Sequence, residues 1–216
     1  MYNPATNLWT PMTTLNAPSA RILHTAVWNN VAGRMIIWGG STTTFSGETN
    51  TGGIFNPVTN LWEGATNTAG APSARNNHTA IWTGTEMITF GGLFNTTVLN
   101  TGGKYNFSTN TWIATNVSGA PSVDLHSAVW IDTAMFISTG NTSNSYNPIT
   151  NLWKPHGGYS SNAGKVSHSS FLAGNMILIW GGTYNPNTGY RYFLTNNIVS
   201  SATTLTNETL YLYQKN

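Results

Sequence analysis

Four histidines recur along the chain at similar intervals and offer the most direct route to a shared site. They are His24, His78, His126 and His168, separated by 54, 48 and 42 residues, and each precedes a short run of β-forming residues. Imidazole rings that face a common axis could bind a transition metal. No carboxylate motif accompanies them, and a residue found in every repeat usually maintains the repeat. We therefore favour a bond from each ring to the backbone of a neighbouring unit, and we predict no metal or other cofactor.

A positive side chain stands three positions before three of these histidines. The cations are Arg21, Arg75 and Lys165, whereas the third repeat has Val123 at this place. A rim of such cations could hold anionic sugars or carboxylates. Because one repeat lacks the cation, we favour a strand-entry residue that bonds backbone carbonyls between units.

Carboxylates are scarce, which limits the catalytic options. The six are Glu48, Glu63, Glu86, Asp124, Asp132 and Glu208. A glycosidase needs two that face each other across a cleft, and no motif marks such a pair. Asp124 lies two residues before His126 and could form an acid–base dyad with it, although a turn role is favoured. We predict no catalytic residue.

The composition excludes several classes of function. Only 6% of the residues are charged and the net charge is +2, so there is no basic field for nucleic acid. The absence of cysteine rules out disulfides and thiol chemistry, and no apolar stretch is long enough to span a membrane. A surface rich in Thr and Asn indicates an extracellular or cell-surface protein.

One eight-residue phrase occurs four times and identifies the elements that must position these side chains. Its copies are 2–9, 55–62, 105–112 and 146–153, with tryptophans spaced by 53, 50 and 41 residues. The Asn-Pro-x-Thr-Asn part is turn chemistry, and the aromatic residues are core candidates. The predicted structural set is Trp9, Trp62, Trp112, Trp153, Tyr105 and Tyr146. A period of about fifty residues predicts a β-propeller.

A second phrase runs in step with the first and reads as two short strands. In the first unit these are 25–28 and 35–38, joined by a turn that contains Asn and Gly. The second strand ends at the glycine pairs Gly39 with Gly40, Gly91 with Gly92, and Gly181 with Gly182, where a positive φ or a crowded backbone is expected. A third strand precedes the aromatic phrase and a fourth begins at its tryptophan. Each unit is thus one four-stranded blade that must stack on others.

These units resemble the kelch-repeat family, and most closely its bacterial extracellular-type arrays. The resemblance rests on the Gly-Gly pair, the Tyr and Trp that follow it, and the Arg-x-x-His before the first strand, over roughly residues 1–190. It implies that the Gly, Tyr and Trp positions are structural. It also implies a ring closed by N-terminal and C-terminal strands that lie close together, to which a strand at 209–213 could contribute.

The predicted fold is all-β: a kelch-type propeller of four-stranded antiparallel blades, with four full repeats plus a partial terminal blade. We expect one domain, 1–216, that is a fragment of a longer chain with other domains. Residues 1–20 supply outer strands of the partial blade, and the full blades are 21–72, 73–121, 122–163 and 164–216.

The loops between the second and third strands vary in length and sequence, and specificity usually lies in such loops. They are 41–50, 93–100 and 141–145, with Phe45 and Phe94 as aromatics that either stack on a ligand or plug the propeller. Candidate binding residues are Arg21, Arg75, His24, His78, His126, His168, Phe45 and Phe94. We predict a non-catalytic module that binds a protein or glycan. The alternative is a carbohydrate-active enzyme, a sugar mutarotase or oxidase-like propeller, with its site at the channel mouth.

Overall fold

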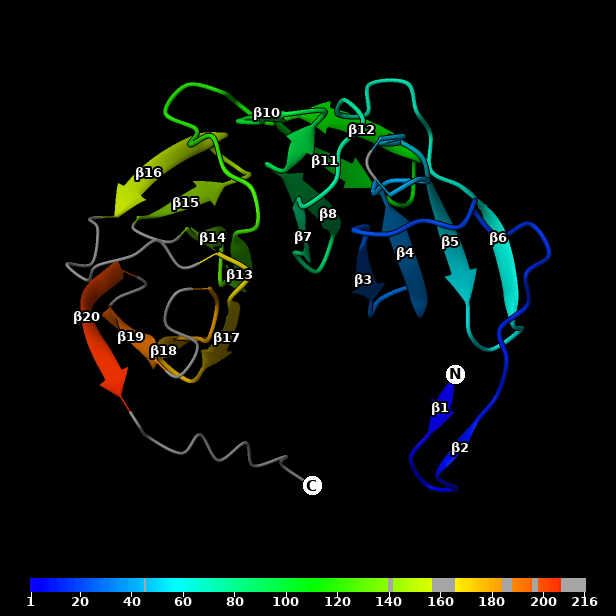
Figure 1. The fold of residues 1–216 in the computed structure, drawn as a ribbon, viewed down its shortest axis with the longest axis horizontal. Helices are drawn as coiled ribbons and strands as arrows, with labels where there is room; N and C mark the ends of the chain where they lie inside the picture. The colour runs from blue at the N-terminus through cyan, green and yellow to red at the C-terminus, as the bar shows by residue number, and fades with distance from the viewer. Residues whose placement is uncertain (45, 140–141, 157–165, 184–187, 196–197, 207–216) are drawn as a thin grey trace.

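The computed structural model describes residues 1–44, 46–139, 142–156, 166–183, 188–195 and 198–206. All regular structure in these residues is β, in four four-stranded antiparallel sheets and two short hairpins. Figure 1 shows the sheets following one another along an arc. The predicted fold class, an all-β propeller-type array of four-stranded blades, is confirmed. No helix in the described residues is long and apolar enough to cross a membrane.

Each blade is an antiparallel meander that begins at the inside of the arc and ends at the outside. Blade I consists of β3 (Thr25–Asn29), β4 (Arg34–Trp38), β5 (Gly52–Asn56) and β6 (Leu61–Ala65). Blade II consists of β7 (Thr79–Trp82), β8 (Glu86–Phe90), β11 (Gly102–Asn106) and β12 (Thr111–Ala114). A small hairpin, β9 (Leu93–Phe94) with β10 (Thr97–Val98), rises between β8 and β11.

Blades III and IV repeat the same order of strands. Blade III consists of β13 (Ser127–Ile131), β14 (Ala134–Ser138), β15 (Ser143–Asn147) and β16 (Leu152–His156). Blade IV consists of β17 (Ser169–Ala173), β18 (Met176–Trp180), β19 (Thr188–Thr195) and β20 (Ile198–Thr206). The first strands β3, β7, β13 and β17 lie side by side along the inside of the arc.

The two ends of the chain differ from the expected ring closure. At the N-terminus, β1 (Tyr2–Asn3) and β2 (Leu8–Trp9) pair only with each other, and β20 pairs only with β19. The expectation that N-terminal and C-terminal strands lie together is therefore wrong for the described residues, and Figure 1 shows them at separate ends of the arc. The strand expected at 209–213 lies outside the described residues.

The core lies between blades, because a single sheet cannot bury both of its faces. Val27, Ile36 and Trp38 of blade I pack in one cluster with Met87, Tyr105 and Trp112 of blade II. The ring centroids of Trp38 and Trp112 are 5.2 Å apart, and those of Phe90 and Trp153 at the next junction are 4.3 Å apart. Blades II and III therefore each pack an indole against the preceding blade, which explains why the tryptophan recurs with the repeat.

The repeated phrase also supplies a polar link between blades. Asn110 adopts a left-handed φ of 52°, and its side-chain oxygen accepts bonds from the Tyr105 hydroxyl at 2.8 Å and from the Asn67 amide at 2.8 Å. Trp112 Nε1 donates to the Asn67 carbonyl at 2.9 Å. The equivalent set in blade III is Tyr146, Asn151, Trp153 and the linker residue Asn116. Trp62 likewise bonds the Thr13 carbonyl, whereas Trp9, on the isolated hairpin, is 77% exposed.

Candidate functional site

The recurring histidines do not converge on a common point, because three of them occupy different junctions between blades and His24 is exposed on the first blade. His78 Nε2 lies 2.8 Å from the Thr25 hydroxyl of the preceding blade. The pair His126 and Thr79 repeats this contact at 2.8 Å, and the pair His168 and Ser127 at 2.7 Å. In these three contacts the partner is a side-chain hydroxyl, and His78 also has a backbone hydrogen bond with Trp38 of the preceding blade. No group of three or more potential metal-ligating His, Cys, Asp or Glu residues occurs in the described part of the chain.

The glycine pairs make room for these rings. A Cβ on Gly39 would lie 2.6 Å from Cε1 of His78, and a Cβ on Gly91 would lie 2.8 Å from Cε1 of His126. The second glycine meets its own blade instead, since a Cβ on Gly92 would lie 2.3 Å from the Asn76 carbonyl oxygen. Gly40 crowds the Ile22 carbonyl in the same way. We call the side of the blades formed by these glycines and histidines the glycine edge.

Burial keeps two of the rings neutral. It lowers the pKa of His78 to about 3 and that of His126 to about 3, with smaller contributions from neighbouring positive groups. A neutral imidazole can accept or donate a hydrogen bond but cannot hold an anion by charge. His24 differs from the other three because it is exposed, with no blade ahead of it along the arc.

The arginines before the histidines are occupied by their own blades. Arg75 is fully buried, and its guanidinium donates to the carbonyls of Gly91 at 2.9 Å and Thr101 at 2.6 Å. Burial lowers its pKa to about 10, so it remains charged near neutral pH. Arg21 makes the same contacts to Gly39 and Thr51. These carbonyls belong to the same blade as the arginine, not to its neighbour, and Lys165 lies outside the described residues.

The loops between the second and third strands were predicted to carry binding residues, and the structure describes only some of them. Phe94 is 41% exposed at the tip of the β9–β10 hairpin, and Phe45 lies outside the described residues. A cavity of about 270 Å³ adjoins the first loop and is lined by Ala20, Arg21, Ile22 and residues 41–44. Arg21 donates its guanidinium hydrogens to protein oxygens there, so it has little capacity left for an anionic ligand.

A larger hollow runs along the inside of the arc, and we call it the axial groove. Its volume is about 430 Å³ and it is lined by Val27, Trp28, Ala80, Ile81, Trp82, Ala128, Val129, Trp130, Ser170, Phe171 and Leu172. No lining side chain is charged. Trp28 is 50% exposed and Phe171 is 45% exposed. The sequence places Trp28, Trp82 and Trp130 at equivalent positions, but only the packing of blades shows that they face one hollow.

A second pocket, with a volume of about 310 Å³, opens beside Trp130 between blades II and III. It is lined by Thr83, Thr85, Glu86, Trp130, Asp132, Thr133, Pro148 and Ile149. We call it the acidic pocket because it brings the carboxylates of Glu86 and Asp132 together. Neither carboxylate pairs with a cation among the described residues, and one oxygen of Glu86 is buried without a hydrogen-bond partner. Trp130 forms part of both the pocket and the axial groove.

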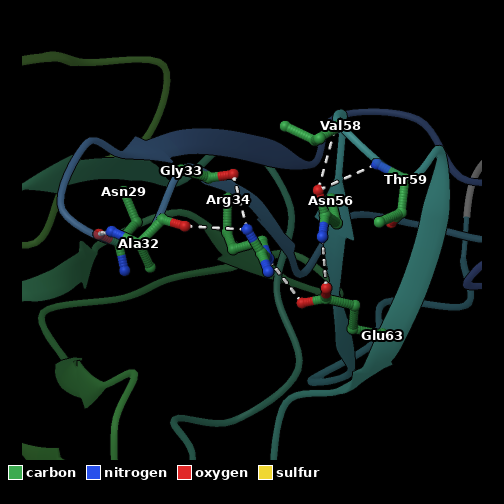
Figure 2. Close-up of polar contacts among 8 residues, drawn as sticks. All are labelled: Asn29, Ala32, Gly33, Arg34, Asn56, Val58, Thr59 and Glu63. Carbon is green, nitrogen blue, oxygen red and sulfur yellow. Dashed lines mark hydrogen bonds and ion pairs between the residues drawn. The ribbon is translucent and has the colours of Figure 1, made fainter.

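Sequence reasoning did not single out this pair of carboxylates, since the two residues belong to different repeats. One signal was available. Glu86 begins the second strand of blade II, where blade I has Arg34. In blade I that arginine donates from Nε to Oε2 of Glu63 at 2.6 Å, and Asn56 donates to Oε1 of the same carboxylate at 2.7 Å (Figure 2).

Each oxygen of the Glu63 carboxylate in blade I therefore has a donor within the blade. The hydrogen bond from Arg34, then that from Asn56, lowers the pKa of Glu63. Arg34 also donates to the Ala32 carbonyl at 2.9 Å, which fixes the guanidinium beside the turn (Figure 2). We call this side of the blades, where the first and second strands join, the turn edge.

Four-stranded blades joined by repeated His–hydroxyl and Trp–carbonyl contacts define a propeller-type repeat protein whose variable parts are its loops and hollows. Comparison with known families agrees. Residues 1–155 match the model of the KLHDC2/KLHL20/DRC7 Kelch-repeats domain, so the chain belongs to the kelch-repeat family. No curated protein matches the chain.

Proposed function

We propose that this kelch array is a non-catalytic binding module that takes a protein or glycan ligand on its axial groove. The observation that carries the proposal is the composition of that groove, which presents indole rings and no charge. The described histidines and arginines of the repeats serve the scaffold instead. An interaction module is also the role that the kelch family suggests, and the Thr- and Asn-rich composition favours an extracellular or cell-surface location.

Exposed aromatic side chains are well suited to this task. Tryptophan supplies a large rigid contact area at a small entropic cost, and it stacks on sugar rings and on apolar side chains alike. Trp28 and Phe171 lie on the first strands of blades I and IV, at opposite ends of the groove. A ligand that spans these strands would contact several blades at once.

The test is to screen the protein against a glycan array and a peptide library, and then to measure the affinity of each hit. We expect Trp28→Ala and Phe171→Ala to weaken binding at least about tenfold, the usual scale of an interface aromatic. Trp9→Ala is the matched control, because this indole is exposed on the separate β1–β2 hairpin. The absence of any hit, or hits that bind all variants equally, would overturn the proposal.

The alternative function is a carbohydrate-active enzyme, and one observation favours it. Glu86 and Asp132 share the acidic pocket, and paired carboxylates are what glycoside chemistry requires. The glycan hits should be incubated with the protein and analysed for hydrolysis, epimerisation or oxidation. Turnover that disappears in both Glu86→Gln and Asp132→Asn would establish this alternative.

A further inference from the structure

We propose that the acidic pocket binds a guanidinium group, namely an arginine side chain of a protein partner. The inference deepens the binding function proposed above and rests on it, since it names one anchor of the partner and the place where that anchor sits. Three features of the pocket carry the argument: an unsatisfied buried carboxylate oxygen, an excess of negative charge, and an indole wall.

The first feature is the Glu86 carboxylate. The turn before it is held by Thr83, whose hydroxyl donates to the Glu86 carbonyl at 3.1 Å and accepts from the Glu86 amide at 3.0 Å. The backbone of Glu86 is thus fixed at the pocket, while its Oε2 is buried and receives no hydrogen bond. Leaving an acceptor without a donor is costly, and because this oxygen has almost no accessible surface, the Glu86 side chain must rotate to present it to the pocket. A ligand that donates to the rotated carboxylate gains affinity.

The second feature is charge. Glu86 and Asp132 both line the pocket, and no described cation lies within ion-pair distance of either. The Lys104 ammonium donates to the carbonyl of Pro148, a residue that lines the pocket, at 3.0 Å, and it forms no ion pair with either carboxylate. The Tyr146 hydroxyl also lies within the field of Glu86. A positively charged donor is therefore favoured over a neutral one in this partly desolvated site.

The third feature is shape. A guanidinium is planar, presents several donors in one plane, and stacks on aromatic rings, whereas an ammonium is a compact point charge without a planar set of donors. Trp130 lines the pocket together with the polar turn residues. Blade I shows the same chemistry within the chain, because Arg34 there meets the Glu63 carboxylate at 2.6 Å (Figure 2). Blade II has the carboxylate at this edge but not the arginine.

The pocket exists because one turn is short. Six residues separate Trp28 from Met35 in blade I, but four separate Trp82 from Met87 in blade II. The longer turn provides Asn30, whose side chain accepts a bond from Trp82 Nε1 of the next blade at 3.0 Å. The shorter turn has no asparagine, and no described residue accepts a bond from Trp130 Nε1. The space beside Trp130 is therefore left for a ligand.

The experiment titrates the full chain, labelled with ¹⁵N, with an acetylated Gly-Arg-Gly amide and follows the indole N–H signals by NMR. The Trp130 signal is assigned from Trp130→Phe. We expect this signal to move with the arginine peptide, and the citrulline analogue to bind at least about tenfold more weakly because it lacks the charge. Glu86→Gln should abolish the shift of the Trp130 signal. If Glu86→Gln does not fold, Asp132→Asn replaces it, because Asp132 lies on an exposed turn, and it should weaken the same shift. Glu63→Gln removes the same charge from blade I and should bind as the wild type does.

Three results would overturn the inference. If Glu63→Gln and Glu86→Gln weaken the binding of the arginine peptide equally, the peptide is attracted by the overall charge of the protein and not by this pocket. If the citrulline peptide binds as tightly as the arginine peptide, the charge of the side chain plays no role. A Trp130 shift with methyl glucoside but not with the arginine peptide would assign the pocket to sugars. If the arginine peptide does not bind while ligands of the axial groove still depend on Trp28, only the inference about the acidic pocket is wrong. If the arginine peptide does not bind and no ligand depends on Trp28, the proposed function is wrong as well.

Discussion

The junction between blades I and II and the junction between blades II and III are alike at one edge and different at the other. At the glycine edge, His78 reaches Thr25 and His126 reaches Thr79, both at 2.8 Å. At the turn edge, Trp82 is bonded to Asn30, whereas Trp130 borders the acidic pocket. The same two blade faces are thus joined by one fixed set of contacts and one variable set.

This difference separates the scaffold from the candidate sites. The glycine edge repeats because each buried histidine ring needs a hydroxyl partner on the preceding blade and a glycine close to the ring. A substitution at either place would disrupt the packing between the two blades. The turn edge tolerates a change in turn length, since the blades are already aligned by the contacts on the other side. A repeat protein can therefore acquire a pocket at this edge without losing the packing between blades.

The largest expected effect is at the glycine edge. Gly91→Ala would place a Cβ 2.5 Å from the Val123 carbonyl oxygen, a backbone atom that cannot easily move, at a φ of +67°. Gly33→Ala is the matched control, because its φ is +65° but a Cβ there meets nothing within 4 Å. Both variants carry about 1 kcal/mol of left-handed strain. We expect Gly91→Ala to lose at least about 2 kcal/mol more free energy of unfolding, measured by urea denaturation.

If the two junctions are equivalent at this edge, Gly39→Ala should be as damaging as Gly91→Ala. A Cβ on Gly39 would lie 2.6 Å from the buried His78 ring and 3.2 Å from the Arg75 carbonyl oxygen. A cost for either variant that matches Gly33→Ala would show that the glycines serve the φ angle alone, and the comparison between edges would fail.

A second effect at the same edge is a dependence of stability on pH. Burial lowers the pKa of both His78 and His126 to about 3, while an unfolded histidine titrates near 6.5. The stabilising effect of each neutral ring is therefore complete above about pH 6.5 and is lost as the pH falls toward 3. The free energy of unfolding should fall by about 1.4 kcal/mol per pH unit for each ring across that window.

His78→Gln and His126→Gln test whether both junctions titrate alike. Each variant should reduce the slope of stability against pH by one proton, in addition to its loss of stability at neutral pH. His24→Gln is the control, because that ring is exposed. If it flattens the slope as much as the others do, the buried rings are not the source.

The sequence was enough to predict the fold, but it was not enough to predict which residues make the scaffold contacts. The period and the Tyr-Asn-Pro-x-Thr-Asn-x-Trp phrase were enough for a kelch-type propeller, because turn chemistry and aromatic spacing are local. The partners of the phrase were not predictable. Nothing local indicates that Trp112 bonds the linker at Asn67, since that contact depends on the stacking of blades. The expected closure by terminal strands came from resemblance alone, and the described strands do not show it.

The acidic pocket illustrates what single-sequence reasoning cannot supply. Glu86 and Asp132 lie 46 positions apart, on turns of different blades, and become neighbours only through the stacking of blades. The exchange of Arg34 for Glu86 at equivalent places was visible, but its meaning depends on whether a partner stands nearby. In blade I the partner is Glu63, whereas in blade II it is absent among the described residues.

The smallest effect is expected from Asn30→Ala, which would make the turn edge of the first junction resemble that of the second. Trp82 Nε1 would lose its acceptor at 3.0 Å, and an exposed hydrogen bond of this kind contributes about 0.5–1 kcal/mol. Thermal unfolding should show that loss, with the exposed Val31→Ala on the same turn as the control. The variant should gain no affinity for the arginine peptide, because Arg34 already neutralises the charge of the nearby Glu63 carboxylate. A gain would mean that an open indole suffices and that the charge of Glu86 is not what the pocket uses.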